Sequence, residues 1–412
     1  MMSKAEKCFR HTNYRISRYK VLVNSLIRFK ISFKIYNMKK KFNYPLFFLV
    51  AFLIGFSLLF FYTLSTPASI QRFGNPNYFF SRHLFFGFLP AIIAGIIAYK
   101  LPVNFIKKWS VWLVAINIFF LFIVFIPFLG ITAGGATRWL NFKYFSVQPS
   151  EFLKMSAILY LSAWIASKLP ENQVSGWKSV AKRSYYNFFY IFVPFLIFLG
   201  IITVALFFQS DASTLAIIGL TLLAVYFSAK TPFWHTLSIV VGGSIFGLLL
   251  IKFEPYRMSR WLTFLNPEAD PLGTGYQLRQ SLISLGSGGI FGRGLGMSTQ
   301  KFGFLPQAMA DSIFAVIGEE LGIIGCTILI LCFILFVWLG IKIAKNSNNR
   351  FAKLSSIGIV FWITFQAFIN ISSTIGIFPL TGVPLPFFSY GGSHLMVELI
   401  AVGLLLNISK NT

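Results

Sequence analysis

Ten long apolar stretches constrain the fold of this chain more than any other feature of its sequence. A helix needs about 20 mainly apolar residues to cross the hydrocarbon core of a bilayer. Because backbone polar groups must be satisfied inside lipid, such stretches predict an all-α integral membrane protein. We predict ten transmembrane helices, at about 45–64, 83–99, 109–130, 150–167, 187–208, 211–229, 233–252, 312–342, 355–377 and 388–408.

The composition agrees with this fold class and excludes an ordinary soluble protein. Apolar residues make up 56% of the chain and charged residues only 11%, whereas soluble chains carry about 25% charged residues. A net charge of +25 would indicate nucleic-acid binding in a soluble protein. In a membrane protein the basic residues are explained by topology and by anionic lipid. We therefore expect membrane lipid, and no nucleic acid, as the partner of these charges.

Basic residues in the connecting segments predict the orientation. With the N-terminus in the cytoplasm, most of the 36 Lys and Arg residues fall on the cytoplasmic side, so we predict that both termini are cytoplasmic. Met38, which is followed by three lysines, is also a plausible translation start. This leaves open whether residues 1–37 belong to the native protein. The predicted parts are a basic tail (1–43), a transmembrane domain (44–408) with a large extracytoplasmic loop between its seventh and eighth helices (253–311), and a short cytoplasmic end (409–412).

Acidic residues gather on the opposite side. In this orientation Glu6 and Glu171 are the only cytoplasmic ones among the 11 acidic residues. Charge in or beside a membrane costs several kcal/mol unless it is paired or functional. We therefore expect the polar chemistry at the extracytoplasmic face. We also expect loop 253–311 to fold back into the bundle as short helices and turns, and the proline-containing segment 376–393 to be kinked or re-entrant.

Two candidate groups precede or begin the fourth predicted helix. Arg138 and Trp139 fit either an interfacial belt, with the arginine reaching toward headgroups, or an arginine that grips a phosphate beside a tryptophan that stacks on a sugar. Glu151, in a Gln-Pro-Ser-Glu sequence, and Lys154 fit a helix start. The alternative is that Glu151 points toward Arg138 across a site.

Further acidic candidates lie at the starts of later helices. Asp211 fits a helix cap or a site residue. Asp311 fits a helix-start acid or a general base, because desolvation at the membrane edge raises the pKa of a carboxyl group. Glu319 and Glu320 lie two turns deeper and point about 100° apart. At least one should face a polar interior, and we favour structural pairing with a loop arginine.

Arginines crowd the long loop. Arg257, Arg260, Arg279 and Arg293 share it with Glu268 and Asp270, among other residues, which is ordinary for a solvated loop. The forked donors of several arginines would equally neutralise a pyrophosphate. Glycine patterns typical of nucleotide sites do not follow a predicted strand here, so nucleotide binding has little support.

Cysteine and histidine residues indicate no further chemistry. Cys8 lies in the basic tail, while Cys326 and Cys332 lie in an apolar run. The four histidines are scattered, so neither a metal cluster nor a Ser-His-Asp triad is proposed. We expect no disulfide and no metal site.

Several blocks in the same order resemble the SEDS family of membrane glycosyltransferases, from about residue 45 to 408. The blocks are Gly135-Ala136-Thr137-Arg138-Trp139, Gln148-Pro149-Ser150-Glu151, Asn266-Pro267-Glu268-Ala269-Asp270-Pro271, Gly275-Tyr276-Gln277-Leu278-Arg279-Gln280-Ser281, Gly318-Glu319-Glu320-Leu321-Gly322 and Pro384-Leu385-Pro386-Phe387-Phe388-Ser389-Tyr390-Gly391-Gly392-Ser393.

This resemblance implies an inverting glycosyltransferase that polymerises lipid II outside the bacterial inner membrane. The 4-hydroxyl of one lipid-linked disaccharide would attack the anomeric carbon of another, and undecaprenyl pyrophosphate would leave. Asp311 matches the essential carboxylate of the family and is expected to be the general base. Arg138, with Arg260 or Arg279, would stabilise the developing pyrophosphate charge. The resemblance also assigns Trp139 and Gln280 to substrate binding, and it gives supporting roles to Glu151, Lys154, Asp211, Glu319, Glu320 and Ser389.

The family resemblance implies partners as well. Its members generally act with a class B penicillin-binding protein, a transpeptidase, and a division enzyme would also meet divisome proteins at the septum. A divalent cation (Mg or Mn) is plausible, but no residue here proves it. Blocks 275–278, 294–298 and 318–320 resemble the division branch, whereas block 382–386 resembles the elongation branch, and we favour division.

Departures from the family pattern keep two alternatives open. Met309 stands where the family commonly has a histidine, and Gly303 where an acid is often found. The Gln-Pro-Asp-x-Gly-Thr pattern has become Gln-Ser-Asp-Ala-Ser-Thr around Asp211. Such losses would weaken positioning of the base, so slow or partner-dependent catalysis is expected. The alternatives are a transporter that flips lipid II and a non-catalytic scaffold for the transpeptidase.

Overall fold

The computed structural model describes residues 42–133, 136–142, 145–168, 186–268, 270, 273 and 275–410. The chain divides into two units, Met1–Phe42 and Asn43–Thr412, and the description below concerns the second. Most of the predicted basic tail and the last two residues of the predicted cytoplasmic end lie outside the described residues, so those boundaries stay predictions.

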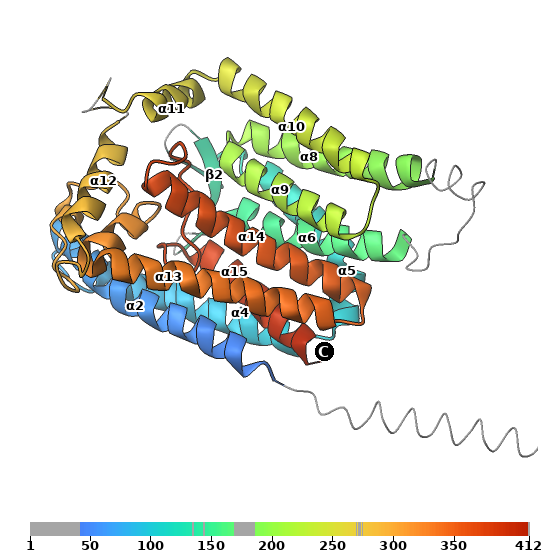
Figure 1. Cartoon of the computed structure of the whole chain (residues 1–412), viewed down its shortest axis with the longest axis horizontal. Helices are drawn as coiled ribbons and strands as arrows, with labels where there is room; N and C mark the ends of the chain where they lie inside the picture. The colour runs from blue at the N-terminus through green and yellow to red at the C-terminus, as the bar shows by residue number, and fades with distance from the viewer. Residues whose placement is uncertain are drawn as a thin grey trace, which may run out of the picture. The chain divides into compact units, whose positions relative to one another are not determined.

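Each of the ten predicted stretches overlaps a helix or a run of consecutive helices (Figure 1). These are α2 (Tyr44–Phe73), α3 (Tyr78–His83) continuing through the π-helical turn η1 (Leu84–Phe88) into α4 (Leu89–Lys100), α5 (Val103–Ile123), α6 (Pro149–Lys168), the π-helical turn η2 (Phe188–Phe192) with α8 (Val193–Phe208), α9 (Ala212–Ser228), α10 (Phe233–Phe253), α13 (Ile313–Asn346), α14 (Arg350–Thr374) and α15 (Gly392–Ser409).

Eight of these segments are long and apolar enough to cross a membrane. The two others are α6 and α9. Helix α9 is shorter, at 17 residues, and α6 carries the charged residues Glu151 and Lys154 in a mostly buried position. The fold class is therefore confirmed as an all-α, multi-pass membrane protein, and the count of ten crossings stays a prediction.

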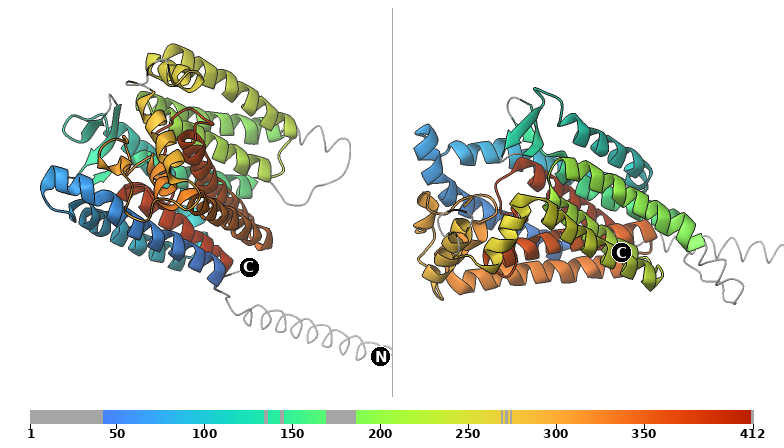
Figure 2. Two further views of the ribbon diagram at one scale, coloured as in Figure 1. Left: turned by 60° about the vertical axis from the view of Figure 1, so that its left-hand side comes forward. Right: turned by 90° about the horizontal axis from the view of Figure 1, so that it is seen from above.

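Helices α6, α14 and α15 form the buried centre of the bundle. Helix α15 packs on α4, and α14 packs on α6, α9 and α13, as the side-by-side helices of Figures 1 and 2 show. Lipid gives no hydrophobic driving force between helices, so close packing and small residues must hold them together. At the α4–α15 crossing, a Cβ added to Gly403 would lie 2.2 Å from the carbonyl oxygen of Gly95.

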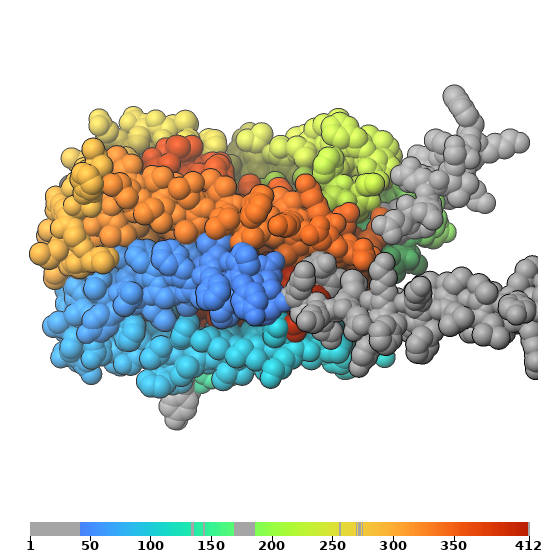
Figure 3. All heavy atoms as spheres, turned by 60° about the horizontal axis from the view of Figure 1, so that its bottom comes forward, coloured from blue at the N-terminus to red at the C-terminus, as the bar shows by residue number. Residues whose placement is uncertain are grey.

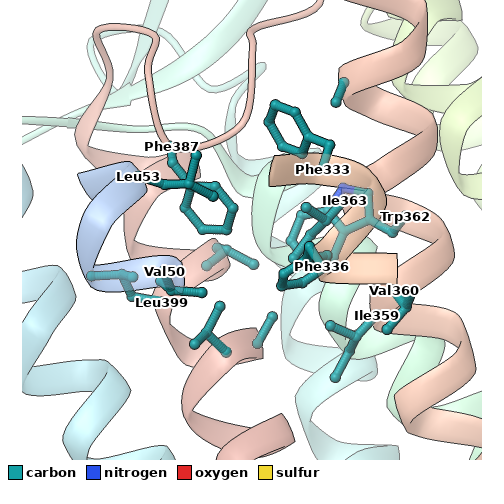
Figure 4. Packing of buried hydrophobic residues seen from close by; sticks show 14 of the residues in the cluster. Val50, Leu53, Phe333, Phe336, Ile359, Val360, Trp362, Ile363, Phe387 and Leu399 are labelled. Carbon is teal, nitrogen blue, oxygen red and sulfur yellow. The ribbon is translucent and has the colours of Figure 1, made fainter. Parts of the chain in front are cut away.

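Large apolar side chains fill the space between α2, α13, α14 and α15. Phe333 and Phe336 of α13 face Ile359 and Trp362 of α14 across this core (Figure 4). Helix α2 lies along α13 on the face that Figure 3 presents. This packing supports the N-terminal end of α13 and the C-terminal end of α14, which matters because the candidate site lies there.

The third predicted helix (109–130) is wrong at its C-terminal end. Helix α5 ends at Ile123 rather than near residue 130, and a small antiparallel sheet follows: β1 (Gly130–Ala133), β2 (Ala136–Asn141) and β3 (Ser146–Val147), in the order β1-β2-β3. Pro127 cannot continue the backbone hydrogen bonding of a helix, and Phe128 takes a positive φ of 72°. The neighbouring residues are apolar, so hydropathy alone predicts that the helix continues through this break. The last predicted helix also begins later, at Gly392 instead of 388.

The long loop folds back onto the bundle, as predicted from its composition. It contains α11 (Pro255–Leu265), α12 (Tyr276–Gly288) and the short 3-10 helix η3 (Gln300–Phe302), and α12 packs along α13. Helix α13 is broken at Gly322, whose φ of 64° and ψ of −165° are not helical. Loop backbone supplies replacements for the missing helix bonds: Ile323 N donates to Gly289 O at 3.0 Å, and Gly294 N donates to Glu320 O at 2.9 Å.

Candidate active site

Asp311 lies two residues before the start of α13, where the long loop returns to the bundle. Its half-buried carboxylate faces α12. The amide nitrogen of Gln277 lies 3.3 Å from each carboxylate oxygen and donates to the Ser312 hydroxyl at 3.0 Å. The carboxylate is thus held in place by a neutral donor, which leaves it free to accept a proton.

Side chains from two other elements fix the backbone around Asp311. Asn370 of α14 donates from Nδ2 to the carbonyl oxygens of Asp311 and Val383, both at 2.8 Å. The Ser389 hydroxyl donates to Ala310 O at 2.6 Å and accepts from Leu385 N at 2.7 Å. The segment between α14 and α15 therefore lies directly against the residues that precede Asp311, in the non-helical form that its prolines predicted.

Burial raises the pKa of Asp311 above the ordinary value of 3.8, and this is the largest influence on it. Smaller influences lower the pKa: the hydrogen bond from Gln277, the backbone N–H groups of Asp311 and Ser312, and the positive charge of Arg260. Arg260 itself donates to Leu380 O at 2.9 Å. A carboxylate with increased proton affinity is suited to act as a general base.

The pH dependence of activity should report the Gln277–Asp311 contact. Removing the amide in Gln277→Ala takes away an influence that lowers the pKa of Asp311, so this pKa should rise further. Because the ionised carboxylate is the active form, the acid limb of the rate profile should move to higher pH. A pH–rate series on the purified variant checks this, and an unchanged acid limb would contradict the assignment of this hydrogen bond.

Arg138 and Glu151 do not face each other as one interpretation expected. Arg138, on β2, donates from Nε to Gln209 O at 3.0 Å and from Nη2 to Ser210 O. Glu151 instead pairs with Lys154 at 2.7 Å, and both side chains are almost fully buried. Arg138 therefore joins the small sheet to the turn between α8 and α9, and the ion pair belongs to the interior of the bundle.

The buried ion pair connects through α14 to the site. Lys154 Nζ donates to Gln366 Oε1 at 2.9 Å and lies 5.2 Å from the ring centroid of Trp362. Gln366 donates in turn to Pro384 O at 3.0 Å. Gln366 is one helical turn before Asn370, and the two amides donate to the adjacent carbonyls of Pro384 and Val383, so α14 carries polar contacts both to Lys154 and to the backbone of Asp311.

The remaining acidic candidates have structural partners. Asp211 caps α9 by accepting from Thr214 N at 3.2 Å, which confirms the capping interpretation, and Ser150 Oγ donates to it at 3.3 Å. Glu319 lies 3.4 Å from the loop arginine Arg293, as favoured from the sequence. Glu320 pairs with Lys301 at 3.0 Å.

Three predicted substrate-binding residues are not joined to Asp311. Arg279 is exposed on α12, and Trp139 and Gln280 are half-buried. Across the described ranges, no hydrogen bond or ion pair connects any of the three with Asp311. Their roles toward a substrate stay predictions.

Gln277, Gln366 and Asn370 are functional candidates that the sequence reasoning missed. Gln277 lies inside a family block, but a neutral amide beside the charged Arg279 carries no distinct signal of function in the sequence. Gln366 and Asn370 are amides within the apolar stretch 355–377. Polar side chains within a span are costly unless they are used, and this signal could have identified both.

The side chains that contact Asp311 do not fit a preformed binding site for a metal ion. In the part of the chain that the structure describes, no group of three or more His, Cys, Asp or Glu side chains could hold a metal ion. The closest side-chain partner of Asp311 is an amide nitrogen, which cannot be a ligand for Mg²⁺, a cation that prefers oxygen. Cys326 and Cys332 are free thiols.

Residues 44–412 match the family model FTSW_RODA_SPOVE, described as "Cell cycle protein". The chain belongs to this family. Its members include proteins named "Probable peptidoglycan glycosyltransferase FtsW" from Coxiella burnetii (36% identical) and from Borreliella burgdorferi (39%). Each alignment covers 87% of this chain and 94% of the relative. The family membership predicted from the sequence blocks is thus confirmed.

A solved structure shares this arrangement of helices. A chain from "Structural coordination of polymerization and crosslinking by a peptidoglycan synthase complex" superposes with a TM-score of 0.69. The match covers 90% of this chain and 98% of the other, at 21% sequence identity. At that identity the likeness concerns the arrangement of the helices alone.

Proposed function

We propose that this chain is a peptidoglycan glycosyltransferase that polymerises lipid II into glycan strands during septal wall synthesis. The observation that carries the proposal is the Asp311 carboxylate, half-buried and held by Gln277 while Asn370 and Ser389 fix the backbone around it. The names of the curated relatives support the reaction class, since both describe a peptidoglycan glycosyltransferase. Membership in the family supports a location in the bacterial inner membrane.

In the proposed reaction, Asp311 takes the proton from the 4-hydroxyl of one lipid-linked disaccharide. The oxygen then forms a bond to the anomeric carbon of a second lipid II molecule, and the bond from that carbon to the pyrophosphate oxygen breaks. Undecaprenyl pyrophosphate leaves with the bonding electrons, and the configuration at the anomeric carbon inverts. Burial supports this role, because it raises the pKa of Asp311 toward the range of an effective base.

Arginines are proposed to stabilise the charge that develops on the leaving pyrophosphate. Arg260 is the best supported, because its charge already acts on Asp311. Arg279 is exposed on α12, two residues beyond Gln277, where it can meet a ligand. Arg138 uses two of its nitrogens on backbone carbonyls and would contribute through the remaining one, with Trp139 and Gln280 contacting the sugars.

The proposed partner is a class B penicillin-binding protein, a transpeptidase. Support comes from the fold, which is shared with a chain from a complex described by its polymerisation and crosslinking of peptidoglycan. Cytoplasmic termini, divisome partners and a position at the septum are part of the proposal for a division enzyme. A RodA-like role in elongation is the alternative within the same family.

One assay separates this function from the alternatives. The full chain is reconstituted with its transpeptidase and labelled lipid II, and glycan strands are resolved on a gel. Strands from the wild type and none from Asp311→Asn support the polymerase. Transbilayer movement of lipid II that survives Asp311→Asn, with no strands formed, would favour a transporter. Normal recruitment of the transpeptidase without strands under any condition would favour a scaffold.

A further inference from the structure

Helix α12 runs beside the first turns of α13, and three contacts fix their register. The Gln277 amide donates to the Ser312 hydroxyl at 3.0 Å. Two turns further, the Ser284 hydroxyl lies 3.0 Å from Ala315 O and 3.1 Å from Glu319 Oε2. At the next turn the backbones touch, since a Cβ added to Gly288 would lie 2.0 Å from the carbonyl oxygen of Gly318.

Glu319 is the carboxylate that joins α12, α13 and the returning loop. Its side chain is fully buried. Besides Ser284, it accepts from the Ser298 hydroxyl at 2.5 Å and from Thr299 N at 3.0 Å. Buried carboxylates are stabilised by several hydrogen bonds of this kind, so the contact with Ser284 is part of a firm network rather than an isolated bond.

Glu320, the neighbouring acid, has a different set of partners. It accepts from Gly296 N at 2.8 Å, from Ser298 N at 3.3 Å and from Lys301 Nζ at 3.0 Å. All three lie in the returning loop. Among the described residues no contact joins the Glu320 side chain to α12, so the two adjacent acids have separate tasks.

We propose that Glu319, acting through Ser284, is a positioning residue that sets the register of α12 and thereby holds Gln277 against Asp311. Residues 284 and 288 lie seven and eleven positions after residue 277, which places all three on one face of the helix. A shift of this face along α13 would carry the Gln277 amide away from the Asp311 carboxylate. The inference rests on the proposed function of Asp311 as the base.

The test is a pH–rate profile of Ser284→Ala, measured with the reconstituted complex and lipid II. We expect kcat to fall about tenfold, since small misplacements of catalytic groups have large effects. The acid limb should move to higher pH, in the same direction as for Gln277→Ala, with KM little changed. Ser287→Ala is the matched control, because Ser287 Oγ donates to Ser284 O within its own helix at 2.9 Å. It should keep the wild-type profile.

Substitution of the two acids completes the test. Glu319→Gln should move the acid limb in the same direction as Ser284→Ala. Glu320→Gln should lower the thermal stability of the protein and leave the acid limb in place. If Glu319→Gln does not fold, the Ser284→Ala profile alone decides. A wild-type acid limb in Ser284→Ala overturns this inference, whereas strand formation by Asp311→Asn overturns the proposed function itself.

Discussion

Asp311→Asn should abolish strand formation while leaving the protein folded. General base catalysis contributes about 10²- to 10⁴-fold to a rate, and an amide cannot accept the proton, so we expect a loss of at least about 100-fold. Burial raises the pKa of Asp311, which means that the folded protein disfavours the ionised form. Above the ordinary pKa the carboxylate therefore costs stability, and a neutral amide removes that cost.

The measurement combines two readouts on the same preparation. Glycan strands are quantified on gels over time, and thermal unfolding is followed in detergent. The expected pair of results is absence of strands with a melting temperature equal to or above that of the wild type. A turnover close to wild type would show that another group takes the proton. A large fall in melting temperature would show that Asp311 is needed for folding instead.

Lys154→Met should have the largest effect on stability. Lys154 and Glu151 form a buried ion pair at 2.7 Å in the mostly buried helix α6. Removing one partner of such a pair costs about 3–5 kcal/mol, because the other charge stays buried without compensation. Gln366, which accepts from Lys154, also accepts from Trp362 Nε1 at 2.9 Å, so its oxygen would not be left without a donor.

A double variant separates the loss of the pair from the loss of one charge. Glu151→Gln combined with Lys154→Met removes both charges while keeping the volumes similar. It should recover most of the melting temperature lost by Lys154→Met alone. If the double variant is as unstable as the single one, the cost does not come from an uncompensated Glu151. If Lys154→Met melts like the wild type, the ion pair contributes nothing to the fold.

Helix positions were predictable because hydropathy acts over a whole span. Every predicted stretch overlaps a helix, including α6, where charged residues interrupt the apolar pattern. The sheet after α5 was not predicted, because Phe128 and Leu129 look like a continued span although Pro127 ends the helix. Short strands between apolar residues leave no periodic signal long enough to read.

Site residues were predictable where a charged residue interrupts an apolar sequence. They were not predictable where tertiary contacts determine which side chains meet. The sequence predicts Asp311 as the base, which stays a prediction, and favours a pairing of Glu319 with a loop arginine, which the structure bears out. Two of the residues that contact Asp311, Gln277 and Asn370, were not predicted, since they come from segments far from Asp311 in the sequence. The choice of Lys154 over Arg138 as the partner of Glu151 depends on tertiary contacts as well, because either basic residue is compatible with the local sequence.

Helix α10 differs from its neighbours in that His235 is its one buried residue, hydrogen-bonded to the Tyr226 hydroxyl at 2.8 Å. Lipid tails, unlike side chains of a neighbouring helix, adapt to any surface shape. Selection on the other residues of α10 should therefore act on hydrophobicity alone. Their identities should vary freely between related organisms, while the mean hydropathy of the helix stays constant. A saturation library across 233–253 would show broad tolerance of apolar exchanges, with His235 as the exception.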